Sequence, residues 1–345
     1  MCVIAGESLR QFLRGCAFPP HADAPYPRAN LDDRRLPADI AAAARVPATV
    51  ALSVSGPATE IELSYTAAQP AGGMRGPSYG TTFAAYPAGA DHPSDEAPAS
   101  PGRGTVRLRV GPGPATVYLP EGMAPTLTGL TGADAAIAPG PPQRRWLAYG
   151  DSITEGWGAS TPGRTWLATA ARRLDLEAVN FGYAGSGRGE LVVAEAMAAV
   201  PADVITIAFG TNCWGMIAFS EDLLKATVRA FVATVRAGRP GVPVVLVSPV
   251  VRPDAETTPN RLGATLAGLR AAYERAALSL GAADPSITLV RGRELVGADQ
   301  LADGIHPDDA GHAALASAVG TAVSAAVSAA AGAGRQPAAS DSSPT

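Results

Sequence analysis

The chain has 345 residues, which is too long for one compact core and predicts two domains. Hydrophobic residues make up 47% of it, so most of the chain can bury a core. The net charge is −4 and no dense basic run occurs, which argues against nucleic acid or an anionic membrane surface as a partner.

The first 140 residues contain short runs in which apolar and polar residues alternate, separated by Gly and Pro. This pattern is typical of a β-sandwich or jelly roll. A short helix is expected at residues 7–16, and a mobile loop at residues 87–104, which are rich in Pro, Ala, Asp and Ser. The expected strands are 49–55, 60–65, 105–110, 115–119 and 126–130.

The pattern changes at residues 138–142, Ala-Pro-Gly-Pro-Pro, which we interpret as a linker. Apolar strands then alternate with helical stretches, as in a parallel sheet covered by helices on both faces. The expected strands are 146–149, 178–181, 204–209, 242–247 and 287–290. The expected helices are 164–174, 190–199, 220–237, 260–280 and 308–331.

These patterns predict a β-sandwich domain at residues 1–138, an α/β domain at 143–332 and a disordered tail at 333–345. The alanine-rich stretch 313–331 is apolar, but it is poor in Leu, Ile and Phe. We therefore expect a terminal helix that packs on the sheet rather than a membrane span.

The cysteines are Cys2, Cys16 and Cys213, an odd number without a CxxC pair, so neither a disulfide framework nor a zinc site is expected. Reduced thiols fit a cytoplasmic protein. The first apolar run stops at Gly6-Glu7, which is too short for the hydrophobic region of a signal peptide.

Ligand sites of open parallel sheets form at the carboxyl ends of the strands, where four loops are expected to meet. The first loop reads Gly150-Asp151-Ser152. The glycine permits a close bend, and the serine stands where the next helix should start. Its hydroxyl suits a nucleophile, but serine at such a junction is also a common helix N-cap. From this loop alone both interpretations stay open.

The second and third loops offer hydrogen-bond donors. Residues 180–189 are rich in glycine, so a substrate could approach the backbone and a glycine N–H could donate; the alternative is a flexible turn. A dinucleotide-binding loop is disfavoured because the spacing does not fit GxGxxG. In the third loop, the Asn212 amide is a neutral donor that suits a developing oxyanion, or a residue that stabilises the turn.

The fourth loop reads Asp303-Gly-Ile-His306, just before the final helix. This spacing lets the Asp303 carboxylate reach Nδ1 of His306, which leaves Nε2 free to act as a base. The other histidines fit less well: His21 and His92 lie in poorly patterned segments of the β half, and His312 lies inside the helix.

Together these segments resemble the four signature blocks of the SGNH (GDSL) hydrolase family: Gly-Asp-Ser, a glycine, Gly-x-Asn and Asp-x-x-His, in order over residues 146–320. The resemblance implies a flavodoxin-like three-layer α/β fold. It also implies Ser152 as nucleophile, His306 as base and Asp303 as the group that orients it. The implied oxyanion hole is formed by the N–H groups of Ser152 and Gly185 and the Asn212 amide, and no metal or organic cofactor is needed.

The third block departs from the family pattern, because Cys213 stands where the family usually has Asp. This leaves the substrate open. Cys213 is a rival nucleophile, but no second histidine is placed for it. Ser186 is a weaker rival, flanked by glycines but without the signature block around it.

Trp157 and Trp214 are candidate substrate-binding residues; Met216, Ile217 and Phe219 extend the apolar loop after Asn212, and packing of that loop is the alternative. The expected function is a carboxylic ester hydrolase that acts through an acyl-enzyme on a small-molecule or sugar ester. The alternative is an acyltransferase that acylates a hydroxyl of a natural product. A binding protein without chemistry is the third hypothesis, which the intact triad disfavours.

Overall fold

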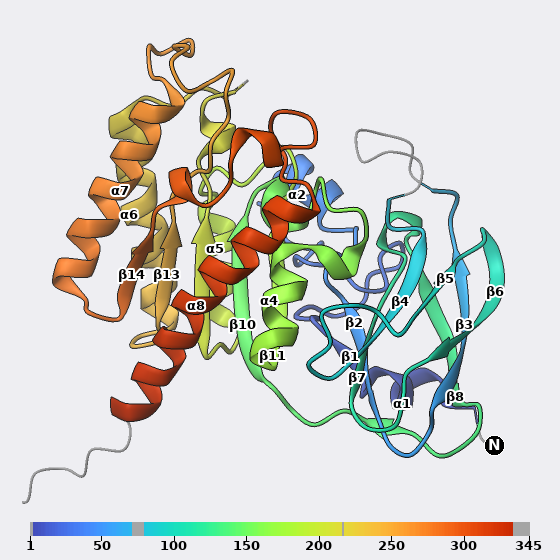
Figure 1. Cartoon of the computed structure of the whole chain (residues 1–345). Helices are drawn as coiled ribbons and strands as arrows, with labels where there is room; N and C mark the ends of the chain where they lie inside the picture. The colour runs from blue at the N-terminus through green and yellow to red at the C-terminus, as the bar shows by residue number, and fades with distance from the viewer. Residues whose placement is uncertain (1–2, 71–78, 216, 334–345) are drawn as a thin grey trace, which may run out of the picture.

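An antiparallel β-sandwich forms most of the first half of the chain, and a parallel sheet flanked by helices forms the second half (Figure 1). The computed structural model describes residues 3–70, 79–215 and 217–333. Cys2, Met216 and nearly all of the predicted tail lie outside the described residues.

The sandwich consists of two antiparallel sheets that share one hydrophobic core. Leu52, Phe83 and Val117 enter this core from one sheet, and Leu63 and Leu108 enter it from the other. The first sheet has the order β1 (Leu13–Arg14), β2 (Ala51–Ser55), β7 (Ala115–Tyr118), β4 (Thr82–Pro87) and β5 (Asp95–Pro98), with β9 (Ala138–Pro139) beside β2; the second has the order β6 (Gly102–Arg109), β3 (Glu60–Ala67) and β8 (Thr126–Gly132). The predicted sandwich is confirmed.

The sequence pattern did not predict the strands β4 and β5, nor the two-residue strands β1 and β9. The expected loop at residues 87–104 is wrong, because β5 lies inside it and β6 begins at Gly102. The strand β5 is an edge strand with a solvated Asp-Glu-Ala-Pro sequence, held by its pairing with β4 and by the Asp95–Arg109 ion pair. In β4, Ala84 and Tyr86 face helix α4 (Trp166–Leu174) while Phe83 faces the sandwich core, so no alternation is visible.

The helix expected at residues 7–16 is shorter than predicted, since α1 covers Gly6–Arg10 and β1 follows it.

The second half contains a five-stranded parallel sheet in the order β11-β10-β12-β13-β14. Alternate residues of β10 enter opposite cores: Leu147 and Tyr149 on one face, Trp146 and Ala148 on the other. The strands are β10 (Arg144–Gly150), β11 (Leu176–Gly182), β12 (Val204–Ala208), β13 (Val244–Val247) and β14 (Ile287–Val290).

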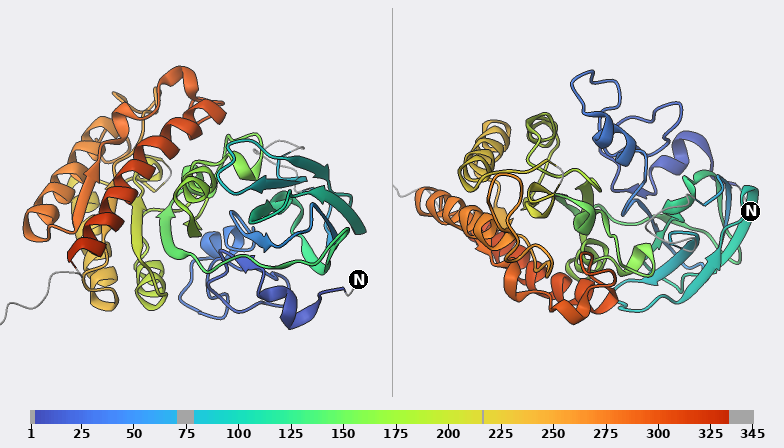
Figure 2. Two further views of the ribbon diagram at one scale, coloured as in Figure 1. Left: turned by 60° about the horizontal axis from the view of Figure 1, so that its bottom comes forward. Right: turned by 90° about the horizontal axis from the view of Figure 1, so that it is seen from above.

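Helices cover both faces of this sheet (Figure 2). One face carries α4 and α8 (Asp309–Ala333), and the other carries α5 (Leu191–Ala199), α6 (Glu221–Gly238) and α7 (Leu266–Ala283). The predicted three-layer α/β fold with flavodoxin-like strand order is confirmed. Helix α7 begins later than expected because Thr265 caps it, while Asn260 holds a turn before it.

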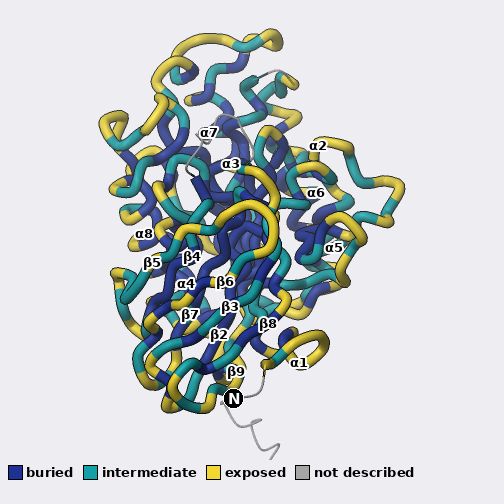
Figure 3. Tube along the Cα trace, turned by 90° about the vertical axis from the view of Figure 1, so that its right-hand side faces the viewer, coloured by how far each residue is buried: buried dark blue, intermediate teal, exposed yellow. Residues whose placement is uncertain are grey.

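The helix α8 is long and apolar enough to cross a membrane by length and composition, with a mean hydropathy of 1.6. Its apolar side chains Leu315, Val319 and Val323 lie in the core that α8 shares with α4 and the sheet. Figure 3 shows that buried positions gather in the strands and inner helix faces, while loops are exposed. The expectation that α8 packs on the sheet is confirmed.

The segment between β1 and β2 packs on both halves: Tyr26 and Val50 lie in the sandwich core, whereas its middle part packs on the α/β half. Ala29, Ile40 and Ala44 belong to the same core as Phe181 of β11 and the side chains of α5, and Ile40 lies in the short helix α2 (Ala38–Ala43). The linker places the boundary near residue 140 in sequence, but in space this early segment completes one face of the α/β layer. The division at residues 138 and 143 stays a prediction.

Candidate active site

The turn after β10 presents Ser152 at the start of a short helix, α3 (Ser152–Glu155). A Cβ atom at Gly150 would lie 2.1 Å from Thr154 Oγ1 and 2.5 Å from the Ala208 carbonyl oxygen, so only glycine fits this bend. The N-cap is Asp151, whose carboxylate accepts the Ile153 N–H at 3.0 Å. The capping interpretation of Ser152 therefore does not hold, and its hydroxyl is free to bond elsewhere.

The hydroxyl of Ser152 donates to Nε2 of His306 across 2.8 Å. On the other side of the ring, Nδ1 donates to Asp303 Oδ2 at 2.7 Å. In the neutral ring this pattern places the proton on Nδ1 and leaves the lone pair of Nε2 facing Ser152. Ser152 and His306 are only 7% and 6% exposed, so the hydroxyl and the ring meet in a site from which most solvent is excluded.

Asp303 is anchored by the turn that it begins. Its Oδ1 accepts the N–H groups of Ile305 at 3.0 Å and His306 at 2.8 Å. Burial alone would raise the pKa of this carboxyl, but the hydrogen bonds from His306 and Ile305 outweigh burial and lower it. Asp303 is thus held ionised and aimed at the ring.

The second loop lies directly against the Ser152 turn, and the third loop is hydrogen-bonded to the second. A Cβ atom at Gly187 would be 2.7 Å from Asp151 Cα, and the Asn212 amide donates to the Ser186 carbonyl at 2.6 Å. One amide hydrogen of Asn212 remains for another acceptor. Gly185 has φ +76°, and nothing lies within 4 Å of where its side chain would start. In the part of the chain that the structure describes, no protein group accepts a hydrogen bond from the N–H of Ser152 or Gly185.

The sequence profile of the GDSL-like lipase/acylhydrolase family matches residues 148–314, which contain all four of these loops. This part of the chain is a GDSL-type enzyme domain. A search of curated proteins found no match.

The similarity to solved structures extends beyond the GDSL domain and includes the sandwich. A salicylyl-acyltransferase, SsfX3, from a tetracycline biosynthetic pathway has 22% identity and a TM-score of 0.80 over 95% of this chain and 97% of its own. A protein of Bacteroides ovatus described as a GDSL-like lipase has 19% identity and a TM-score of 0.75, with 92% and 95% covered. A family two carbohydrate esterase from Clostridium thermocellum has 15% identity and a TM-score of 0.60, with 81% and 92% covered. At these identities the likeness establishes the shared fold.

Trp157 of the GDSL domain lies beside the predicted base, with its ring centroid 5.2 Å from that of His306. The buried His312 fixes its backbone, because Nε2 of His312 donates to the Trp157 carbonyl at 2.9 Å while Nδ1 accepts the Trp166 N–H at 3.1 Å. Burial lowers the pKa of His312 to about 4, which keeps the ring neutral. His312 is therefore a support for the site, as its position inside α8 suggested.

Trp214 packs on the loop after β13. Its Nε1–H donates to the Thr258 carbonyl at 2.7 Å, and the Arg252 guanidinium lies 4.9 Å from its ring centroid. These contacts favour the packing interpretation of Trp214, whereas Trp157 faces the site.

The rival nucleophiles are inaccessible. Cys213 and Ser186 are fully buried, and burial raises the pKa of the Cys213 thiol far above its usual range. His21 pairs with Asp23, and His92 is exposed. Ser152 meets His306 instead.

Within the described residues, no group of three or more His, Cys, Asp or Glu side chains is arranged to hold a metal ion.

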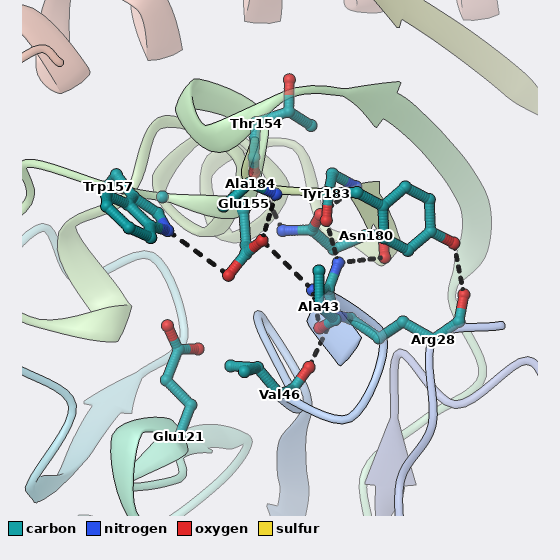
Figure 4. Close-up of polar contacts among 12 residues, drawn as sticks. Arg28, Ala43, Val46, Glu121, Thr154, Glu155, Trp157, Asn180, Tyr183 and Ala184 are labelled. Carbon is teal, nitrogen blue, oxygen red and sulfur yellow. Dashed lines mark hydrogen bonds and ion pairs between the residues drawn. The ribbon is translucent and has the colours of Figure 1, made fainter. Parts of the chain in front are cut away.

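The sequence did not reveal the polar cluster behind the Gly185 loop (Figure 4). Arg28, from the segment before α2, contacts Glu155 of α3 and the backbone at the end of β11. Glu155 directly follows the first signature block, which is a weak signal. Arg28 stands in a Pro-rich segment without periodicity, so no local pattern marks it.

Proposed function

We propose that this GDSL enzyme cleaves carboxylic esters through an acyl-enzyme on Ser152. The supporting observation is the continuous chain of hydrogen bonds from the Ser152 hydroxyl through His306 to Asp303, at 2.8 Å and 2.7 Å. Ser152 Oγ attacks the ester carbonyl while Nε2 of His306 takes its proton. The anionic Asp303 stabilises the imidazolium that forms, without taking the proton.

The oxyanion of the tetrahedral intermediate is bound by the N–H groups of Ser152 and Gly185 and by the free amide hydrogen of Asn212. Such donors act on charge that develops only in the transition state. Collapse of the intermediate breaks the ester C–O bond, and the alcohol leaves with the proton from His306. Water then attacks the acyl-enzyme, His306 takes its proton, and the released acid restores Ser152.

We propose a small-molecule or sugar ester as the substrate, and Trp157 as a residue that contacts it. The fold is shared with carbohydrate esterases of family two, which align with 81% of this chain. Trp157 is partly exposed and its ring lies beside the His306 ring, where the alcohol part of an ester would leave.

Acyl transfer to a hydroxyl is the second candidate function. The observation that favours it is the extent of the likeness to the salicylyl-acyltransferase, which covers nearly the full length of both chains, sandwich included. Chemically the two functions differ only in whether water or another hydroxyl attacks the acyl-enzyme. The widely spaced cysteines, Cys16 and Cys213, support a cytoplasmic location in either case.

The test is hydrolysis of p-nitrophenyl esters of increasing acyl size, with and without sugar and phenolic alcohols. Ester cleavage that Ser152→Ala abolishes supports the proposal, and a transesterified product that exceeds free acid indicates transfer. The proposed function is contradicted if the protein cleaves no ester and forms no covalent adduct with a serine-directed phosphonate. The remaining hypothesis is then a binding protein without chemistry.

A further inference from the structure

A buried ion pair links the N-terminal segment to the GDSL domain. Arg28 Nη2 lies 3.5 Å from Glu155 Oε2, and the two side chains are only 1% and 2% exposed. Arg28 precedes α2, whereas Glu155 ends the short helix that begins with Ser152. Burying two charges is costly unless their remaining hydrogen bonds are made, so the surroundings of the pair matter.

The guanidinium of Arg28 is held from several directions. Nε donates to the Val46 carbonyl at 2.6 Å and Nη2 to the Ala43 carbonyl at 2.7 Å, both in its own segment. Nη1 donates to the carbonyls of Gly182 and Asn180 at the end of β11. Because the rigid, planar guanidinium makes all these hydrogen bonds at once, Arg28 fixes the end of β11 relative to residues 43–46.

The carboxylate of Glu155 carries this constraint into the site. Oε2 accepts the Ala184 N–H at 2.7 Å, one residue before Gly185. Oε1 accepts from Trp157 Nε1 at 3.4 Å, and the Trp157 ring lies beside His306. Figure 4 shows the two oxygens of Glu155 directed to these different partners. One carboxylate therefore contacts both the predicted oxyanion loop and the Trp157 ring beside His306.

A second contact from the same segment holds the other side of Gly185. Asp39 of α2 pairs with Arg188 at 2.8 Å, and Arg188 Nη1 donates to the Gly185 carbonyl. The Tyr183–Ala184 and Gly185–Ser186 peptide groups, which flank the peptide group that carries the Gly185 N–H, are thus both tied to residues 28–46. In the described structure, Gly185 has φ +76° and open space where a side chain would start, so its conformation is not fixed by packing of its own.

We propose that Arg28 and Glu155 are positioning residues that aim the Gly185 N–H into the oxyanion hole, so that the N-terminal segment is a working part of the catalytic unit. This inference rests on the proposed function. A donor displaced by about 1 Å can cost about 100-fold in rate. Since the oxyanion exists only in the transition state, the loss falls on kcat and spares KM.

The experiment compares the wild type with Arg28→Met, Glu155→Gln and the double variant. Each single variant leaves one buried charge without its partner, so it lowers both Tm and kcat. The double variant leaves no unpaired charge, so it regains part of the Tm that the single variants lose, although the carbonyls that Arg28 bound stay without their donor. We expect its kcat to stay 10- to 100-fold low, with KM within about twofold. Recovery of kcat together with Tm would overturn the proposal, because it would mean that the ion pair contributes only to the stability of the fold.

Arg35→Met is the matched control. Arg35 also joins the N-terminal segment to the GDSL domain, through Glu195 at 2.6 Å, but this pair is exposed and Glu195 belongs to α5 instead of the oxyanion loop. We expect kcat and KM of this variant to equal those of the wild type. A loss of kcat as large as that of the double variant would also count against the proposal.

Amide hydrogen exchange gives a readout that needs no substrate. The double variant should exchange faster than the wild type over residues 183–188, with α6 unchanged, because Arg28 no longer holds the end of β11 and the Ala184 N–H exchanges a charged acceptor for a weaker neutral one. If the wild type cleaves no ester but this acceleration occurs, the proposed function fails and the positioning contact stands. If exchange over residues 183–188 is unchanged, the positioning role fails, whatever the activity.

Discussion

Protonation of His312 should destabilise the GDSL domain in a defined pH window. The ring is fully buried in α8, accepts the Trp166 N–H at Nδ1 and donates to the Trp157 carbonyl from Nε2. A charged ring has no lone pair at Nδ1, so it cannot accept the Trp166 N–H. Because the site is buried, the charge would also be without hydration. Burial is the main reason why the pKa of His312 lies at about 4 instead of 6.5.

The sign follows from proton binding. Between about pH 4 and 6.5 the unfolded chain binds a proton at His312 that the folded chain does not bind. The contribution of the neutral His312 ring to the free energy of unfolding is therefore complete above pH 6.5, and it is lost as the pH falls through this window. A gap of about 2.5 pH units corresponds to about 3 kcal/mol in the free energy of unfolding.

The assay is urea unfolding followed by tryptophan fluorescence at about pH 7, 5.5 and 4.5, for the wild type and His312→Gln. All four tryptophans lie in the second half of the chain, so the signal reports on the GDSL domain. Glutamine can accept from Trp166 and donate to Trp157 without titrating. We expect the wild type to lose more unfolding free energy than the variant on acidification, approaching about 3 kcal/mol at the acid end. Equal losses in both proteins would refute the reasoning.

The remaining predictions concern the chemistry. Ser152→Ala should abolish ester cleavage without changing the circular dichroism spectrum, and near-full turnover would exclude Ser152 as the nucleophile. Asp303→Asn should lower kcat about 10⁴-fold because it favours the wrong tautomer of His306, whereas a loss below tenfold would deny it that role. Asn212→Ala should lower kcat by about 10²- to 10³-fold with little change in KM, and an effect on KM alone would place Asn212 in ground-state binding. EDTA should leave the rate unchanged, and a loss that zinc restores would contradict a metal-free mechanism.

Local sequence was sufficient for much of the fold and for the candidate site. The strands of the parallel sheet are buried on both faces, so they stand out as continuous apolar runs such as 204–209. Because parallel strands end at one edge, the residues after β10, β11 and β12 had to meet. The Asp303–His306 contact is also local, since one turn of three residues sets it.

The sandwich was only partly predictable. Its strand β4 is buried on both sides, by its own core and by α4, so its alternation is hidden. The edge strand β5 is held by backbone pairing and one ion pair instead of buried side chains. No periodicity marks either arrangement, and composition favoured a loop for β5.

Only the tertiary structure decided what supports the site. Arg28 and Asp39 stand in a segment without a pattern, and their partners lie in loops far along the chain. Such pairings depend on where α2 docks against β11. That docking buries Ile40 and Ala44, and two apolar residues do not form a periodic pattern that could be recognised in the sequence. The sequence by itself therefore determined which groups are candidates for the proposed chemistry. The packing of residues 28–46 determined how rigidly the Gly185 loop is held, because rigidity comes from long-range contacts.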